Sequence, residues 1–262
     1  MDASSGFCRL MYRWFGRTAA VGYHHTFLRN YPAPVTFGPV PPSARIRQAL
    51  DAYRPGWAPS ELCNIMARNG SDKGIGRHNY SIFYGTLLKD LRSAPLNIFE
   101  LGIGTTDLKL KSNMGLEGRP GASHRGWREF FPNAHVFGAD IDRQILDQGN
   151  EIPCFYCDQT SVASIRALWS NEALADIAFD IIIDDGLHEF EPNRTFLESS
   201  IHKLARGGIY ILEDIMDHDL SAWRIYVSNN TLAGGKYRMT LIELPHEYNS
   251  VDNNLLCVEW GE

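Results

Sequence analysis

The sequence is short of cysteine, of long apolar runs and of positive charge. Five cysteines in 262 residues, an odd number, do not make a disulfide scaffold, so a reducing, cytoplasmic setting is the simpler expectation. No run of 18 apolar residues occurs, which predicts that the chain has no membrane span. Lys and Arg number 25 against 31 Asp and Glu, a net charge of −6, which argues against a nucleic-acid partner.

Acidic residues are missing between Asp2 and Asp51, where the basic residues are arginines. An Arg-rich, acid-poor start is typical of an organelle transit peptide, but also of an amphipathic helix that docks on another surface. We interpret residues 1–50 as a basic docking segment and a candidate contact in a homo-oligomer. The proline-rich stretch Tyr31–Ser43 within it predicts an extended connector. The arginines are Arg9, Arg13, Arg17, Arg29, Arg45 and Arg47.

Residues 97–262 alternate short apolar runs with amphipathic stretches, a pattern typical of a parallel sheet with helices on both faces. The clearest helical pattern runs from Phe190 to Leu204 and is expected to stop at Gly207-Gly208. Tyr237–Leu244 and Leu255–Trp260 predict an antiparallel hairpin at one edge. We therefore expect an α/β, Rossmann-like sheet of seven mostly parallel strands, with residues 51–96 as a helical cover. The five expected parallel strands are Asn97–Leu101, His135–Ala139, Pro153–Cys157, Phe179–Ile183 and Ile209–Leu212.

The first of these strands leads into a glycine turn, Glu100-Leu101-Gly102-Ile103-Gly104. Glycines at such a turn let the backbone approach a ligand closely. A dinucleotide fingerprint needs a third small residue, but Asp107 stands at that position. An acid there would repel a phosphate, so NAD-linked oxidoreduction is disfavoured.

Acidic residues end the following strands, at the edge of a parallel sheet where ligands bind. Asp140 can accept hydrogen bonds from ribose hydroxyls, Asp158 and Gln159 can meet the amino edge of adenine, and Glu100 can balance a positive ligand. A cationic nucleoside without phosphate suits these groups. The sequence around Asp140 is Gly-Ala-Asp-Ile-Asp, and the sequence around Asp158 is Cys-Asp-Gln. Together with Glu-x-Gly-x-Gly, these motifs resemble those of class I S-adenosylmethionine-dependent methyltransferases, over about residues 70–262.

A second acidic group surrounds the ends of the fourth and fifth strands. Asp184 and Asp185 follow one strand, Glu213 and Asp214 the next, and His188 lies three residues after Asp185. Carboxylates that face one point repel each other unless a cation is present, and hard oxygen ligands suit Mg²⁺. We assign Asp185, Glu213 and Asp214 to the metal and Asp184 to the cofactor side of the site.

This second group resembles the metal-dependent sugar O-methyltransferases of the mycinamicin and macrocin type. The resemblance implies that Asp185, Glu213 and Asp214 hold Mg²⁺ and that His188 is the general base. Catechol O-methyltransferases are similar but place a lysine at the position of His188. The resemblance also places Ser71 and Lys73, upstream, over the methionine end of the cofactor.

The sequence thus predicts a Mg²⁺-dependent O-methyltransferase that uses S-adenosylmethionine to methylate a hydroxyl of a small molecule, most simply a sugar of a glycosylated natural product. Two alternatives remain open: a catechol-like aromatic acceptor, and a catalytically silent scaffold that only binds the cofactor. The long segment 105–132, with four glycines and several basic residues, is expected to cover the site as a lid or to form a solvated loop.

Overall fold

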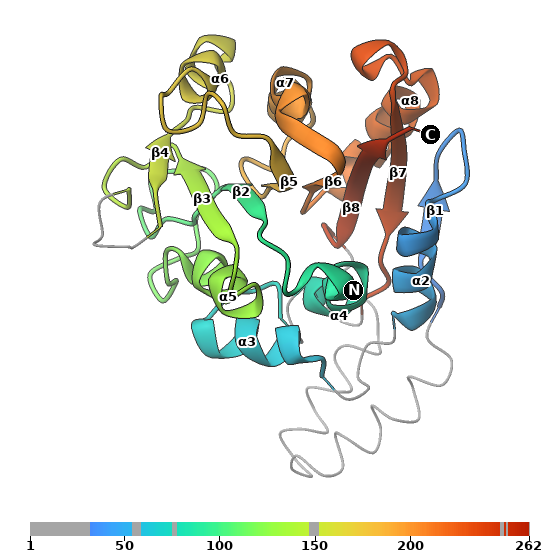
Figure 1. The fold of residues 1–262 in the computed structure, drawn as a ribbon, viewed down its shortest axis with the longest axis horizontal. Coiled ribbons are helices and arrows are strands. Elements are labelled where there is room, and N and C mark those ends of the chain that lie inside the picture. The colour runs from blue at the N-terminus through green and yellow to red at the C-terminus, as the bar shows by residue number, and fades with distance from the viewer. Residues whose placement is uncertain are drawn as a thin grey trace.

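The computed structural model describes residues 32–261 apart from 54–58, 75–77, 147–151, 247–248 and 250. Eight strands form one sheet in the order β1-β7-β8-β6-β5-β2-β3-β4 (Figure 1). The strands β2, β3, β4, β5 and β6 run parallel, whereas β8, β7 and β1 are antiparallel to their neighbours. The strands are β1 Val35–Phe37, β2 Asn97–Leu101, β3 His135–Asp140, β4 Cys154–Tyr156, β5 Phe179–Asp184, β6 Leu204–Leu212, β7 Tyr237–Glu243 and β8 Asn254–Trp260.

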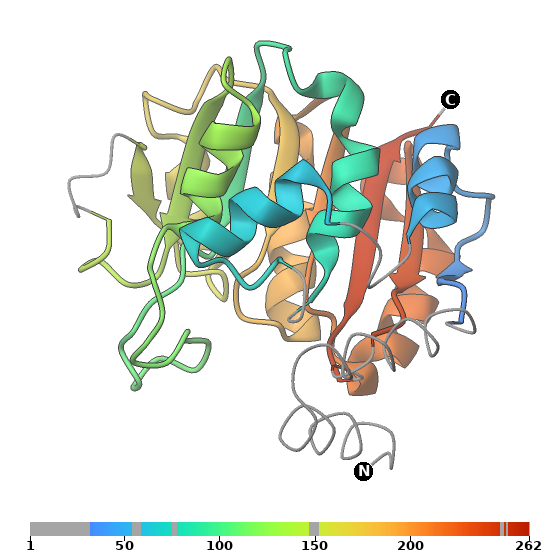
Figure 2. The same ribbon diagram turned by 90° about the horizontal axis from the view of Figure 1, so that it is seen from below.

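Helices cover both faces of the sheet (Figures 1 and 2). The helices α2, α3, α4 and α5 lie on one face, and α6, α7 and α8 lie on the other. Their bounds are α2 Ala44–Ala52, α3 Glu61–Asn69, α4 Tyr80–Leu87, α5 Ala122–Phe130, α6 Val162–Trp169, α7 Phe190–Ser200 and α8 Leu220–Asn229, with single 3₁₀ turns at Lys89–Leu91, Ile201–Lys203, Asp217–Asp219 and Leu232–Gly234. None of the described helices is long and apolar enough to cross a membrane.

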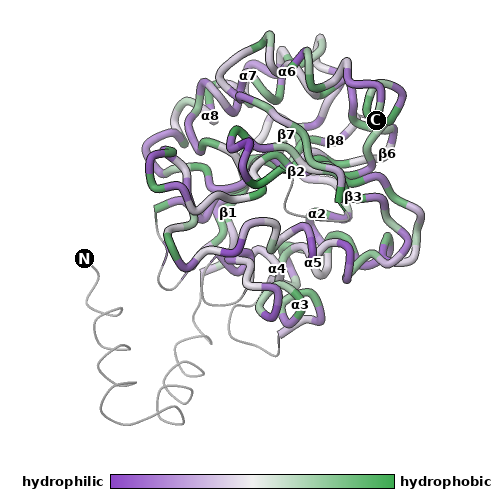
Figure 3. Tube along the Cα trace, turned by 90° about the vertical axis from the view of Figure 1, so that its left-hand side faces the viewer, coloured by the Kyte–Doolittle hydropathy of each residue, from purple (hydrophilic) through white to green (hydrophobic). Residues whose placement is uncertain are grey.

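The apolar strands alternate their side chains between two cores, one on each face. In β5, Ile181 and Ile183 join the core beneath α3, α4 and α5, while Ile182 between them joins the core beneath α6, α7 and α8. This period of two is a property of extended backbone. Hydrophobic colour accordingly follows the strands in the middle of the molecule, and hydrophilic colour is more frequent on the outer segments (Figure 3). The expected doubly covered α/β sheet and its antiparallel hairpin are confirmed.

Two details differ from the expectation. The helix α7 ends at Ser200, and Leu204 already pairs with Phe179 as the first residue of β6. Gly207-Gly208 therefore lies inside a strand and not after a helix, at a place where the register between β5 and β6 shifts. The sheet also has eight strands instead of seven, because Val35–Phe37 in the proline-rich connector pairs with β7.

The division into segments 1–50, 51–96 and 97–262 stays a prediction. The docking role of the arginine-rich start falls mostly on residues 1–31, which lie outside the described residues. Within the described part, Arg45 pairs with Glu259 of β8, so at least this arginine is used inside the chain.

Candidate active site

The glycine turn lies at the carboxyl end of β2, between β3 and β5. Gly102 has φ +90°, its N–H donates to the carbonyl of Ala139 at 2.8 Å, and a Cβ at Gly102 would lie 1.9 Å from the carbonyl oxygen of Asp185. Asp185 in turn donates its N–H to the carbonyl of Leu101 at 2.9 Å. The turn therefore locks the ends of three strands together, and only glycine fits at its centre.

Asp140, at the end of β3, organises the next part of the turn. One of its carboxylate oxygens accepts the N–H of Ile103 at 2.8 Å and that of Gly104 at 3.3 Å. The other oxygen accepts the N–H of Asp142, whose own carboxylate accepts the Thr105 hydroxyl at 2.5 Å. Burial raises the pKa of Asp140, although these backbone donors oppose the rise. Asp142 was not predicted; its position two residues after Asp140 was the available clue.

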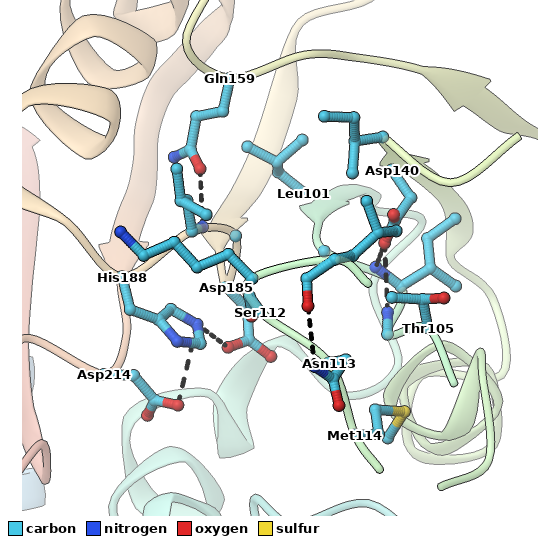
Figure 4. Close-up of a pocket in the computed structure, with 18 of the residues that line it drawn as sticks. Leu101, Thr105, Ser112, Asn113, Met114, Asp140, Gln159, Asp185, His188 and Asp214 are labelled. Atoms are coloured by element: carbon cyan, nitrogen blue, oxygen red, sulfur yellow. Dashed lines mark hydrogen bonds and ion pairs between the residues drawn. The ribbon is translucent and has the colours of Figure 1, made fainter. Parts of the chain in front are cut away.

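A cavity of about 380 Å³ opens over this turn. Asp140 and Thr105 lie at one end of it, and His188 and Asp214 lie at the other (Figure 4). Pockets of this size suit a nucleoside-sized ligand. Of the predicted cofactor-binding residues, six line the cavity: Ser71, Gly102, Gly104, Asp140, Asp158 and Gln159.

The segment between β2 and α5 supplies one wall of the cavity, through residues 109–114. Met114 donates its N–H to the carbonyl of Thr105 at 2.8 Å, and Lys111 pairs with Glu189 at the start of α7. The segment thus spans the distance from the glycine turn to the residue that follows His188. Its role as a lid remains a prediction.

Asp185, His188 and Asp214 meet at the other end of the cavity, and their ligand atoms lie within 4.8 Å of one another. The Nε2 atom of His188 is 3.2 Å from Asp185 Oδ1 and 3.9 Å from Asp214 Oδ2. Both His188 (φ +59°) and Asp214 (φ +53°) have left-handed backbone, which is costly for residues other than glycine. Backbone strain of this kind is concentrated at functional sites, so it supports a functional role for the trio.

The electrostatics of this trio are dominated by its acids. Burial alone would lower the pKa of His188, but the hydrogen bond with Asp185 and the charge of Asp214 raise it to about 9. Burial alone would raise the pKa of Asp185, but Lys73 and His188 lower it below its usual range. Burial raises the pKa of Asp214. Without a cation, His188 therefore holds a proton at neutral pH, in contrast to the near-neutral pKa that a resting general base would need.

Glu213, the third predicted metal ligand, lies apart from the trio. It is buried, it contacts the ammonium group of Lys73, and its other oxygen accepts the hydroxyl of Tyr84 at 2.6 Å. Its role as a metal ligand remains a prediction. Lys73, expected at the cofactor, lies instead between Glu213, Asp185 (2.5 Å) and Glu100 (3.2 Å).

Glu100 and Asp184 are buried beneath the cavity and do not form its wall. Asp184 accepts both Gln159 Nε2, at 2.8 Å, and the hydroxyl of Tyr210, at 3.0 Å. Gln159 Oε1 accepts the N–H of Leu187, so this pair fixes the loop that carries His188. The arrangement supports a structural role for Asp184 behind the site and leaves Gln159 less free to reach adenine than the sequence suggested.

Asp140 provides a direct test of the cavity. Replacing Asp140 with alanine is expected to weaken binding of S-adenosylhomocysteine by roughly tenfold to a hundredfold, because hydrogen bonds to a charged group are worth about 1.5–3 kcal/mol. Titration calorimetry measures the change. Glu117→Ala removes an exposed acid of the segment between β2 and α5 that does not line the cavity, and it should leave the affinity unaltered. Equal affinities for the two variants would contradict the assignment.

The fold is that of class I S-adenosylmethionine-dependent methyltransferases. The MycE methyltransferase from the mycinamycin biosynthetic pathway, in complex with Mg and SAH, superposes with a TM-score of 0.58 at 22% identity, over 78% of this chain and 55% of that one. A complex of the same enzyme with Mg, SAH and mycinamycin VI gives 0.57 at 23% identity. The fold expected from the glycine turn and the acidic strand ends is confirmed.

Within that class, the chain is similar to sugar O-methyltransferases. It is 27% identical over 224 residues to the 8-demethyl-8-alpha-L-rhamnosyl tetracenomycin-C 2'-O-methyltransferase of Streptomyces olivaceus, covering 85% of this chain and 56% of the relative. It is 30% identical over 204 residues to the L-olivosyl-oleandolide 3-O-methyltransferase of Streptomyces antibioticus, covering 76% and 48%. The chain spans about half the length of these relatives. No family model matches the sequence. The resemblance stated from the motifs is confirmed.

Proposed function

We propose that this protein is a metal-dependent O-methyltransferase that moves a methyl group from S-adenosylmethionine to a sugar hydroxyl of a glycosylated natural product. One observation carries the proposal: Asp185, His188 and Asp214 converge at the end of a nucleoside-sized cavity that opens over the glycine turn and Asp140. The similarity to sugar O-methyltransferases supports the choice of acceptor.

The two carboxylates of the trio fit a divalent cation, and the imidazole of His188 lies beside them. Two carboxylates and one imidazole face one point, and Asp185 and Asp214 supply the oxygen atoms that Mg²⁺ prefers. Tyr80 donates its hydroxyl to Asp214 Oδ1 at 2.8 Å, and His78 Nδ1 lies 3.2 Å from the same oxygen. These contacts hold Asp214 in place, as the neighbours of metal ligands usually do.

The proposed roles follow from position. Asp140 would bind the ribose hydroxyls, and Gly102 and Gly104 would let the backbone approach the cofactor. A divalent cation on Asp185 and Asp214 would lower the pKa of an acceptor hydroxyl. His188 would take the hydroxyl proton at Nε2. The oxygen would then form a bond to the methyl carbon as the bond from sulfur to that carbon breaks, leaving S-adenosylhomocysteine.

The proposal predicts that chelation stops methyl transfer without releasing the cofactor. With labelled S-adenosylmethionine and a panel of glycosylated and catechol acceptors, EDTA should lower the transfer rate by about a hundredfold or more, because Lewis-acid activation of the hydroxyl is lost. Added Mg²⁺ should restore the rate. Binding of S-adenosylhomocysteine, measured in parallel, should be nearly unchanged. Full transfer in EDTA would exclude a metal-dependent reaction, and transfer to catechols alone would exclude the sugar acceptor.

A further inference from the structure

His188 is held in a left-handed backbone conformation, with φ +59°. A residue other than glycine keeps this strained conformation only where its surroundings fix it. On the side that precedes His188, Leu187 donates its N–H to Gln159 Oε1 at 2.8 Å. The imidazole itself faces Asp185 Oδ1 through Nε2 (Figure 4). Fixing the loop at both ends requires a further contact on the side that follows His188.

Asp219 makes that contact from another element of the fold. Its Oδ2 accepts the N–H of Phe190, the first residue of α7, at 3.0 Å. The ring of Phe190 packs edge-on against Trp223 of α8, with 4.9 Å between the ring centroids. The start of α8 therefore holds Phe190, two residues after His188, through both its backbone and its side chain.

The direction of the Asp219 side chain is unusual. Asp219 is the N-cap residue of α8, a position from which an aspartate usually accepts an N–H of its own helix. In the described part of the chain, neither Asp219 nor Glu189, the N-cap residue of α7, makes a capping bond to its own helix. Asp219 instead caps α7, whose N-terminus favours a negative charge. The acid thus stabilises the helix that begins beside His188.

The other polar contacts near this turn are exposed. Glu189 pairs with Lys111, and both side chains lie in solvent. His218 lies 3.9 Å from Asp219 Oδ1, the oxygen that does not meet Phe190, and its side chain is 71% exposed. Exposed ion pairs contribute little to stability, because water screens them. The side chain of Asp219 is only 19% exposed, so its bond to Phe190 is the firmer contact.

We infer that Asp219 is a positioning residue for His188. By accepting the N–H of Phe190, it fixes the loop on one side of His188 while Gln159 fixes the other side, and the imidazole stays aimed at Asp185. This inference rests on the proposed function, which makes His188 the proton acceptor. Without the bond, the backbone strain of His188 is released by rotation, and the imidazole leaves the end of the cavity.

The test compares Asp219→Ala with Asp219→Asn and Asp180→Ala. Asparagine keeps an oxygen that can accept the N–H of Phe190, whereas alanine does not. Asp180 is the matched control, because it is also half-buried and its Oδ2 accepts a backbone N–H, that of Asn97, at 2.8 Å. This bond lies at the amino ends of β2 and β5, at the opposite edge of the sheet from the site. The two alanine variants should therefore lose similar stability in thermal unfolding.

The first measurement needs no acceptor. Diethyl pyrocarbonate modifies accessible imidazoles, and peptide mass spectrometry gives the rate at which His188 reacts. In Asp219→Ala this rate should rise by roughly tenfold, because the lost hydrogen bond to a charged group is worth about that factor in the population of the anchored loop. Asp219→Asn and Asp180→Ala should react at nearly the wild-type rate.

The second measurement is methyl transfer from labelled S-adenosylmethionine to the fastest acceptor of the glycosylated panel described above. In Asp219→Ala, kcat should fall by about tenfold or more, since a catalytic group that is misplaced loses rate steeply. KM for S-adenosylmethionine should stay nearly unchanged, Asp219→Asn should restore most of kcat, and Asp180→Ala should match the wild type.

A general loss of structure would instead affect Asp219→Ala and Asp180→Ala alike. Wild-type reactivity of His188 in Asp219→Ala, or an Asp219→Asn variant no better than Asp219→Ala, would overturn the inference. A wild-type protein that methylates no acceptor of the panel would overturn the proposed function, while the modification rates would still show whether Asp219 holds His188 in place.

Discussion

Replacing His188 with alanine is expected to lower the rate of methyl transfer by a factor of about 10²–10⁴, the usual contribution of a general base. His188 Nε2 lies 3.2 Å from Asp185 Oδ1 and 3.9 Å from Asp214 Oδ2 at the end of the cavity. Because His188 lies away from Asp140 and the glycine turn, the affinity for S-adenosylhomocysteine should stay nearly unchanged. Steady-state kinetics with labelled cofactor and calorimetric titration measure the two effects.

The pKa of His188 adds a pH dependence to this result. Only neutral imidazole accepts a proton, and in the metal-free protein the acids around His188 raise its pKa to about 9. A divalent cation on Asp185 and Asp214 would offset these acids and lower that pKa, so the wild-type rate should increase with pH along a limb whose midpoint lies below 9. The His188→Ala variant should not show this increase in rate with pH. His218→Ala, which removes an exposed histidine of the neighbouring loop, is the control and should retain both rate and profile. A His188→Ala protein that is folded and fully active would show that another group takes the proton.

Replacing Gly102 with alanine is expected to destabilise the fold by at least about 3 kcal/mol. The added methyl group would lie 1.9 Å from the backbone oxygen of Asp185, and that oxygen cannot move without shifting the end of β5. Overpacking against backbone and a left-handed φ each cost about 1–3 kcal/mol. For a domain of this size, such a loss lowers the melting temperature by roughly 6–12 °C.

Gly115 offers the control, because it shares the left-handed backbone but not the crowding. Its φ is +71°, and no atom lies within 4 Å of the position that a Cβ would take. Gly115→Ala should therefore cost only about 1 kcal/mol, the penalty of the backbone conformation. Thermal or urea unfolding of both variants separates the cost of the left-handed backbone from the cost of the contact with Asp185. Equal stabilities would mean that the contact between the turn and β5 is not as tight as the geometry indicates.

The parallel strands and the glycine turn could be predicted because each depends on local sequence. Asn97–Leu101 is an apolar run followed by glycine, and apolar runs that lead into an acid mark β3 and β5. The sequence predicted a helix that runs past the end of α7 for a related reason. Leu204 continues the helical spacing of Phe190 and Leu197, yet it pairs with Phe179, a contact 25 residues away that no local pattern encodes.

The separate roles of the acids could not be predicted, since each role depends on the direction in which the side chain points. Neighbouring residues at a strand end face opposite sides of the sheet. Asp184 therefore turns into the layer that holds Tyr210, while Asp185 reaches the cavity. Glu213 and Asp214 separate in the same way, and the buried partner of Glu213, Lys73, comes from a segment 140 residues earlier. The spacing of these acids along the sequence does not distinguish those that face the cavity from those that are buried behind it.

The position of β8 has a consequence for how the chain folds. The strands β7 and β1 reach the parallel part of the sheet only through β8, which pairs with β6 on one side and β7 on the other. Strand β1 lies about 200 residues from β7 along the chain, and Ser43 and Arg45 contact Glu259 across more than 200. Contacts between residues so distant in sequence slow folding, because loop entropy is lost before the contacts form. We expect the nucleus to form among β2, β3 and β5, with closure by β8 and β1 as the late step.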